Sequence, residues 1–237
     1  MSRLSGKIAL ISGASRGVGQ AVAVRAAGEG AHVVLVARTT GGLEETDDRI
    51  RAAGGQATLV PCDLTQSGMV SRLADALFER FGRLDILIGN AGELGILSPV
   101  AHIDTKLWER TFALNVVANQ RLIRVFDPLL RASEAGRAVF VTGREADAGK
   151  PFWSVYAASK AALEQMVLAY AAEVAHSSLR VNLIRPCPVA TALRAKAYPG
   201  EDAGKLPKPE AITGAFIDLA APECSRHGEI VDALPDS

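Results

Sequence analysis

The segment Ser12-Gly13-Ala14-Ser15-Arg16-Gly17-Val18-Gly19 lies between an apolar run at 7–12 and a helical pattern at about 18–29. Glycine lets the backbone turn tightly and approach a phosphate group, and the start of a helix offers free N–H groups with a positive partial charge. A glycine triplet alone is a weak signal, and an ordinary strand-to-helix turn is the alternative. The strand–turn–helix context favours a dinucleotide-binding turn.

The alternation of short apolar runs and helical patterns continues after this turn. The expected strands are residues 7–12, 32–37, 57–61, 84–89, 137–142, 179–184 and a short segment near 229–231. The expected helices are residues 18–29, 42–53, 67–81, 105–132 and 154–176. Several strands are apolar almost throughout, which is typical of a parallel sheet buried on both faces. The sequence therefore predicts an α/β protein with a Rossmann fold, in which helices cover both faces of a doubly wound, seven-stranded parallel sheet.

The chain shows neither an internal repeat nor a linker, so we expect residues 1–237 to form a single domain. One irregular stretch at about 186–209 contains proline, glycine and charged residues. Long irregular loops inside a folded domain are often functional, so we expect this stretch to be a substrate flap.

Composition limits the possible partners and the location. Lys+Arg and Asp+Glu both number 26, which leaves no net charge to attract nucleic acid or an anionic membrane. The scattered Cys62, Cys187 and Cys224 form no CxxC pair, which argues against disulfides and a metal site and fits a reducing compartment. The first residues leave no room for a signal peptide, and no apolar run reaches the roughly 18–20 residues of a membrane span. We expect a soluble, cytoplasmic protein without a metal.

Several motifs resemble those of the short-chain dehydrogenase/reductase family. The spacing of Gly13, Gly17 and Gly19 resembles its TGxxxGxG turn, with Ser12 in the threonine position. The sequence Asn90-Ala91-Gly92 resembles its NAG motif. The sequence Arg180-Val181-Asn182, followed by Pro186 and Thr191, resembles its RVNxxxPGxxxT segment, with Cys187 in place of the glycine. The run at 197–202 resembles a bacterial subgroup of oxidoreductases whose substrate is undefined.

This resemblance implies a nicotinamide dinucleotide cofactor. In the family, the residue at the position of Asp63 contacts the adenine ring, and the segment from Pro186 to Thr191 borders the nicotinamide. The cofactor-binding residues expected on this basis are Gly13, Ser15, Arg16, Gly17, Val18, Gly19, Arg38, Asp63, Leu64, Asn90, Ala91, Gly92, Tyr156, Lys160, Pro186, Val189 and Thr191.

The end of the second expected strand indicates which cofactor is preferred. An acidic residue there would bind the ribose hydroxyls of NAD, but this chain has Ala37-Arg38-Thr39. Arg38 can pair with a 2′-phosphate, and Arg16 lies where NADP-preferring relatives carry a basic residue. Either arginine could instead be only solvated. We expect NADP(H) to be preferred over NAD(H).

Tyr156 and Lys160 are the expected catalytic pair. They lie four residues apart, on one face of an expected helix. A nearby cation should lower the tyrosine pKa from about 10, so that the phenol can exchange a proton with a carbonyl or alcohol oxygen. The resemblance implies that Lys160 also holds the nicotinamide ribose. It also gives Asn115 the position that holds a proton-relay water in relatives. The other interpretation of Asn115, a buried amide bonded to neighbouring backbone, is compatible with that role.

Gly143 interrupts this pattern, because the family carries a serine thirteen positions before the tyrosine. Loss of one such hydrogen-bond donor typically lowers turnover by about 100- to 1000-fold. Thr142, Arg144 and Ser154 are nearby candidates for a replacement, although Thr142 should point away from the site and Ser154 could be a helix cap. The glycine could also admit a bulkier substrate, or leave the role to a backbone N–H or a water.

The expected substrate pocket lies between residues 93–97, 143–153 and 189–208. An apolar wall would come from Leu94, Ile96, Leu97, Phe152 and Trp153, although each of these could simply be core. We therefore expect a hydrophobic carbonyl or alcohol as the small-molecule substrate. The helices at 105–132 and 154–176 resemble those that pair across a two-fold axis in relatives, which implies a homodimer or homotetramer.

The motifs and Gly143 are relevant to three possible functions. The favoured one is an NADP(H)-dependent oxidoreductase that interconverts a carbonyl and a secondary alcohol, with Tyr156 as acid/base. The alternative is an NADP(H)-binding protein of low or no activity, acting as a sensor or interaction partner, which Gly143 supports and the intact Tyr156, Lys160 and Asn115 oppose. A nucleic-acid binder is disfavoured because the chain has no basic stripe.

Overall fold

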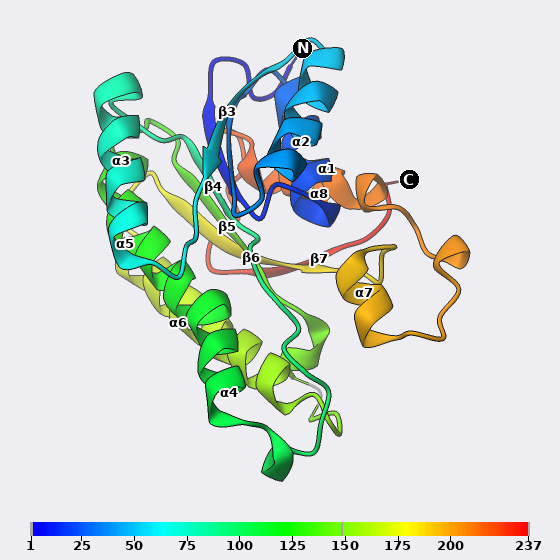
Figure 1. Ribbon diagram of the computed structural model, residues 1–237. Helices are drawn as coiled ribbons and strands as arrows, with labels where there is room; N and C mark the ends of the chain where they lie inside the picture. Colours follow the sequence, from blue (N-terminus) through cyan, green and yellow to red (C-terminus); the bar gives the residue numbers. More distant parts are fainter. Residues whose placement is uncertain (1, 148, 237) are drawn as a thin grey trace.

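A parallel β-sheet forms the centre of the computed structural model, which describes residues 2–147 and 149–236 (Figure 1). Its strand order is β3-β2-β1-β4-β5-β6-β7, and every neighbouring pair is parallel. The chain therefore winds outward from β1 in one direction and then from β4 in the other, which confirms the predicted fold class. The strands are β1 (Ile8–Ser12), β2 (His32–Ala37), β3 (Gln56–Pro61), β4 (Ile86–Gly89), β5 (Arg137–Val141), β6 (Arg180–Pro186) and β7 (Ile230–Ala233).

Helices cover both faces of this sheet (Figure 1). One layer contains α1 (Gly17–Gly28), α2 (Thr40–Ala52) and α8 (Thr213–Ala220). The other contains α3 (Ser67–Phe81), α4 (Thr105–Phe112), α5 (Ala118–Arg131) and α6 (Ser154–Val174). The short α7 (Ala192–Ala197) projects beside the end of β6. None of the helices in residues 2–147 and 149–236 combines the length and apolar character of a membrane span.

Alternating strand residues supply two separate cores, one on each side of the sheet. In β1, Ala9 and Ile11 belong to the core beneath α1 and α8, whereas Ile8 and Leu10 belong to the core beneath α3, α5 and α6. Successive strand side chains point to opposite faces, so an all-apolar strand serves both cores. Full burial of one aliphatic side chain contributes about 1.5–3 kcal/mol. Short, mainly apolar strands in the middle of the sheet therefore stabilise the fold through both cores.

The observed elements differ from the sequence predictions in three places. Strand ends shift by one or two residues, which is the usual uncertainty of a boundary. The helix expected at 105–132 is divided by a π-helical turn (Ala113–Val117) between α4 and α5. Helices α7 and α8 were not predicted, since α7 is a six-residue helix inside the flap and α8 is an eight-residue helix whose apolar residues show no clear period. Four 3₁₀ turns complete the described elements: Val100–His102, Arg144–Ala146, Ala203–Lys205 and Pro209–Ile212.

Candidate functional site

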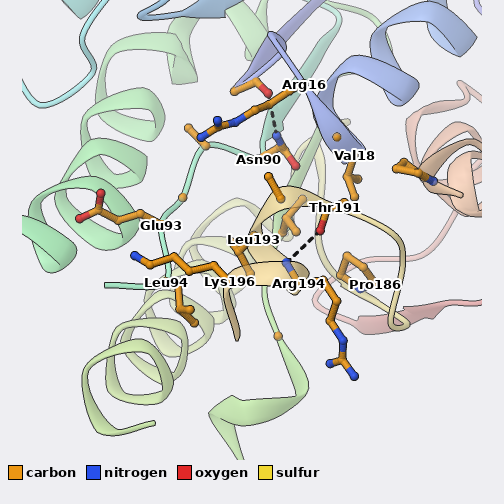
Figure 2. Close-up of a pocket in the computed structure, with 18 of the residues that line it drawn as sticks. Arg16, Val18, Asn90, Glu93, Leu94, Pro186, Thr191, Leu193, Arg194 and Lys196 are labelled. Atoms are coloured by element: carbon orange, nitrogen blue, oxygen red, sulfur yellow. Dashed lines mark hydrogen bonds between the residues drawn. The ribbon is translucent and has the colours of Figure 1, made fainter. Parts of the chain in front are cut away.

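A cleft of about 900 Å³ lies at the carboxyl ends of the strands, between the start of α1 and the flap. Figure 2 shows Arg16, Asn90 and Thr191 approaching it from the glycine turn, the end of β4 and the flap. Of the cofactor-binding residues expected from the sequence, all line this cleft except Gly19, which is buried behind the turn. Asn115 also does not line it. The cleft therefore brings together residues that are spread over most of the chain.

The glycine turn holds a conformation that larger residues would oppose. Gly13 and Gly17 have φ angles of +66° and +60°, in the left-handed region that favours glycine. A Cβ on Gly13 would lie 2.8 Å from Asn90 Nδ2, and a Cβ on Gly19 would overlap with Asn90 Nδ2 and the Gly13 carbonyl oxygen. Hydrogen bonds between Ser12 and Asn90 hold the glycine turn against the end of β4. The Asn90 amide Nδ2 donates to the Ser12 carbonyl at 2.9 Å, and the Asn90 backbone N–H donates to Ser12 Oγ at 2.9 Å.

The N-terminus of α1 forms one wall of the cleft. The helix begins at Gly17, and the Arg16 side chain at its N-cap makes no capping hydrogen bond. Gly17 and Val18, the first residues of the helix, line the cleft. The N–H groups of a first helical turn and the positive end of the helix dipole together favour an anion such as a pyrophosphate.

Two arginines stand beside this anion site. Arg16 and Arg38 are exposed, and neither guanidinium bonds to another side chain within residues 2–147 and 149–236. Asp63 lies at the same end of the cleft, where its Oδ1 accepts hydrogen bonds from the Thr65 hydroxyl at 2.7 Å and the Thr65 N–H at 3.0 Å. These bonds, and to a lesser extent the charge of Arg38, lower the pKa of Asp63. The two arginines thus remain able to pair with a phosphate.

Tyr156 and Lys160 line the other end of the cleft, from α6. Both are nearly buried, with 7% and 3% of their surfaces exposed. Lys160 Nζ donates to the Val141 carbonyl oxygen at 2.8 Å and lies 5.8 Å from the centre of the Tyr156 ring. Burial lowers the pKa of Lys160 to about 8, although the charges of Glu164 and Glu145 act in the opposite direction.

The pKa of Tyr156 moves in the direction opposite to the sequence prediction. Burial raises it, and the negative charge of Glu145 raises it further. The expected net lowering of this pKa is therefore wrong for this structure. The physical reason is that desolvation of the buried phenolate is the largest contribution to the shift.

Asn115 occupies the π-helical turn, where its side chain is fully buried. Its Oδ1 accepts from the Glu93 N–H and its Nδ2 donates to the Glu93 carbonyl, both at 2.9 Å. Nδ2 also donates to Ser159 Oγ at 2.9 Å, and that hydroxyl donates to the Tyr156 carbonyl at 2.8 Å. The amide therefore fixes the segment after β4 against the turn of α6 that carries Tyr156. This geometry shows the backbone-bonded amide expected from the sequence, and the compatible role in holding a water stays a prediction.

Gly143 faces the Tyr156 hydroxyl. A Cβ on Gly143 would lie 3.2 Å from the Tyr156 hydroxyl oxygen. Two of the three proposed replacements, Thr142 and Arg144, line the cleft but their side chains pair with other residues, and the third does not line it. The Thr142 hydroxyl donates to Glu164 Oε1 at 2.8 Å, Arg144 pairs with Asp232 at 3.2 Å, and Ser154 is not among the described residues that line the cleft.

The carboxylate of Glu145, a residue not predicted to belong to the site, lies beside the space that a side chain on Gly143 would occupy, here called the gap above Gly143. Glu145 Oε2 would be 3.0 Å from a Cβ on Gly143. Glu145 belongs to the 3₁₀ turn Arg144–Ala146 and lines the cleft. The only signal in the sequence was an acidic residue two positions after the missing serine, and its orientation depends on how this turn folds.

The expected apolar wall is present in part. Leu94 and Trp153 are buried and pack with Tyr156 and Ala197, and the Trp153 ring lies 5.5 Å from that of Tyr198. Both Leu94 and Trp153 line the cleft. Ile96 and Phe152 do not line the cleft. Their side chains face solvent and are 44% and 57% exposed. Ala148, in the expected wall 143–153, lies outside the described residues.

Comparisons with known proteins agree with this arrangement. A family model described as short chain dehydrogenase matches residues 7–202. The uncharacterized oxidoreductase YciK of Escherichia coli K12 is 34% identical over 239 residues, which cover 98% of this chain and 93% of YciK. A short-chain dehydrogenase structure from Pseudomonas syringae has a TM-score of 0.95 and 32% identity, covering 98% of this chain and 96% of its own. One from Escherichia coli CFT073, complexed with NADPH, has a TM-score of 0.92 and 34% identity, covering 99% of both chains. The chain belongs to the short-chain dehydrogenase/reductase family of oxidoreductases.

Proposed function

We propose that the protein is an NADP(H)-dependent oxidoreductase that interconverts a carbonyl and a secondary alcohol. The observation that carries this proposal is the arrangement of the cleft. One end has a helix N-terminus flanked by two arginines, and the other has the Tyr156–Lys160 pair beside an apolar wall. The similar Escherichia coli CFT073 structure is complexed with NADPH, which supports this choice of cofactor.

The described residues fit such a cofactor. Gly13 and Gly17 leave the wall of the cleft free of side chains where a pyrophosphate would meet the start of α1. The adenosine end would lie near Arg16, Arg38 and Asp63, and the nicotinamide end near Lys160. The remaining residues proposed to hold the cofactor are Ser15, Val18, Leu64, Asn90, Ala91, Gly92, Tyr156, Pro186, Val189 and Thr191, with Gly19 supporting the turn from behind. When bound, the cofactor supplies or accepts the hydride.

Tyr156 is the proposed acid/base of the reaction. Its raised pKa keeps the phenol protonated, which suits donation of a proton to a carbonyl oxygen. Lys160, with a pKa of about 8, is largely protonated at pH 7, so its charge can stabilise the phenolate that remains. Asn115 contributes by fixing the segment at Glu93 against the turn of α6 that carries Tyr156.

The test of the proposed function is turnover by the wild type in both directions: NADPH consumption with a broad panel of apolar ketones and aldehydes, and NADP⁺ reduction with the corresponding alcohols. We expect turnover of at least one of them. The second candidate, a cofactor-binding protein without turnover, is favoured by Gly143, which offers no hydroxyl group to the reacting oxygen. Tight NADPH binding without any turnover, together with activity in Gly143→Ser, would support that alternative and contradict our proposal.

Cofactor preference depends on Arg38 in this proposal. We expect Arg38→Ser to weaken NADPH binding by about 10- to 100-fold, because charge-assisted hydrogen bonds contribute about 1.5–3 kcal/mol. NADH binding should change little, since NADH has no 2′-phosphate. Fluorescence titration with both cofactors measures the two affinities. Arg25→Ser, on α1 and paired with Glu29, is the matched control. Tighter binding of NADH than of NADPH to the wild type would refute the role of Arg38.

We also propose a homodimer or homotetramer as the assembly and an apolar small molecule as the substrate. The first proposal is supported by apolar side chains that remain partly exposed along the outer layer, including Val117, Val125 and Met166. The second is supported by the contact of Leu94 and Trp153 with Tyr156 at the cleft.

A further inference from the structure

The gap above Gly143 has two oxygen-bearing groups on its border. The Tyr156 hydroxyl and Glu145 Oε2 lie 3.2 Å and 3.0 Å from the same point, the position of a Cβ on Gly143. The two oxygen atoms are therefore at most about 6 Å apart, roughly the span of two hydrogen bonds that share one oxygen. A single substrate oxygen held by Tyr156 can thus also reach Glu145.

The Glu145 carboxylate is available for such a contact. No side chain or N–H group of residues 2–147 and 149–236 bonds to it, and it is only half-buried in the wall of the cleft. The other polar groups around the gap are engaged. Thr142 bonds to Glu164, and Lys160 bonds to the Val141 carbonyl. The Arg144 guanidinium pairs with Asp232.

We propose that Glu145 takes the place of the missing serine as the second group that contacts the reacting oxygen, and that it makes the site select the alcohol over the carbonyl. This inference rests on the proposed oxidoreductase function. It assigns Glu145 a role in substrate selectivity, through a hydrogen bond from the substrate hydroxyl to the carboxylate.

The chemistry of the two groups gives this selectivity its direction. An ionised carboxylate only accepts hydrogen bonds, whereas a serine hydroxyl both donates and accepts. An alcohol can donate its O–H to Glu145 while it accepts from the Tyr156 hydroxyl. A carbonyl oxygen carries only lone pairs, so it can accept from Tyr156 but meets a second acceptor at Glu145. A site with Gly143 in the serine position and Glu145 beside it therefore favours the alcohol, which is the substrate that can be oxidised.

Dead-end complexes test this preference without turnover. We use 1-phenylethanol with NADPH and acetophenone with NADP⁺, because neither mixture can react, and both probes are apolar. The shift of melting temperature with probe concentration gives the two dissociation constants. In the wild type we expect the alcohol to bind more tightly than the ketone. In Glu145→Gln, whose amide can donate, we expect the ratio of ketone to alcohol dissociation constants to fall by about 10- to 100-fold.

Asp147→Asn is the matched control, because it removes a negative charge from the same loop without bordering the cleft. In this control, the ratio of ketone to alcohol dissociation constants should equal that of the wild type. A ratio in Glu145→Gln within twofold of the wild type would overturn the selectivity role, as would a failure of both probes to bind either protein up to their solubility. Failure of the proposed function looks different: no variant would bind NADPH, or Tyr156→Phe would turn over as fast as the wild type.

Discussion

Replacing Tyr156 by phenylalanine is expected to lower turnover by about 100- to 10,000-fold, the usual contribution of general acid–base catalysis. The change removes only the hydroxyl that faces the gap above Gly143. The ring remains packed against Trp153, at a centroid distance of 6.0 Å, so the fold of the cleft is retained. The affinity for NADPH should therefore stay within about twofold. Steady-state kinetics with a substrate found in the panel, together with NADPH titration, separates the two effects.

Tyr170→Phe provides the control for this variant. Tyr170 lies on the same helix, α6, but its hydroxyl donates to Asp127 Oδ1 at 2.7 Å, away from the cleft. Its loss should lower stability by about 1 kcal/mol and leave turnover unchanged. Equal turnover in the wild type and Tyr156→Phe would contradict the acid/base assignment.

The second large effect is expected for Gly19→Ala. The new methyl group would overlap with Asn90 Nδ2 and the Gly13 carbonyl, so α1 and the end of β4 would have to separate. Such overpacking costs about 1–3 kcal/mol, and a melting temperature lower by roughly 3–10 °C should result. Because the anion site depends on the position of the first turn of α1, we expect NADPH binding to weaken by about 100-fold or more.

Gly28→Ala separates this steric effect from the general effect of alanine in a helix. Gly28 is the last residue of the same helix, and no atom lies within 4 Å of the position that its Cβ would take. Alanine there should leave NADPH binding unchanged and raise stability by up to about 1 kcal/mol. Differential scanning calorimetry and cofactor titration of both variants check the pair. A Gly19→Ala protein with normal binding would show that the turn tolerates separation from Asn90.

The order of elements was predictable because the middle strands are buried on both faces. All residues of β1 and β5 are buried, and apart from Ser12 and Arg137 at their ends these strands are apolar throughout. Helix α8 was missed for a related reason. Phe216, Ile217 and Leu219 are all buried, and a helix covered on several sides has no polar face to give it a period.

The positions of the site residues were also predictable, but their electrostatics were not. The glycine turn, Arg38 and the Tyr156–Lys160 pair reach one cleft because parallel strands bring their carboxyl ends to the same edge. The direction of the Tyr156 pKa shift depends on burial and on the charge of Glu145. Both arise from the folding of the loop after β5, which has no repeating pattern in the sequence.

The π-helical turn of Ala113–Val117 has a consequence for the phase of the helices on either side of it. An α-helix advances about 100° per residue, and a π turn accommodates one residue more than an α turn. The extra residue allows Asn115 to point toward Glu93 and Ser159 while Leu122 and Phe126 of α5 still face the core. If the same number of residues formed ordinary α-helix here, α4 would be rotated by about 100° relative to α5. The wider π turn, and not only the identity of Asn115, therefore determines which side of α4 faces α6.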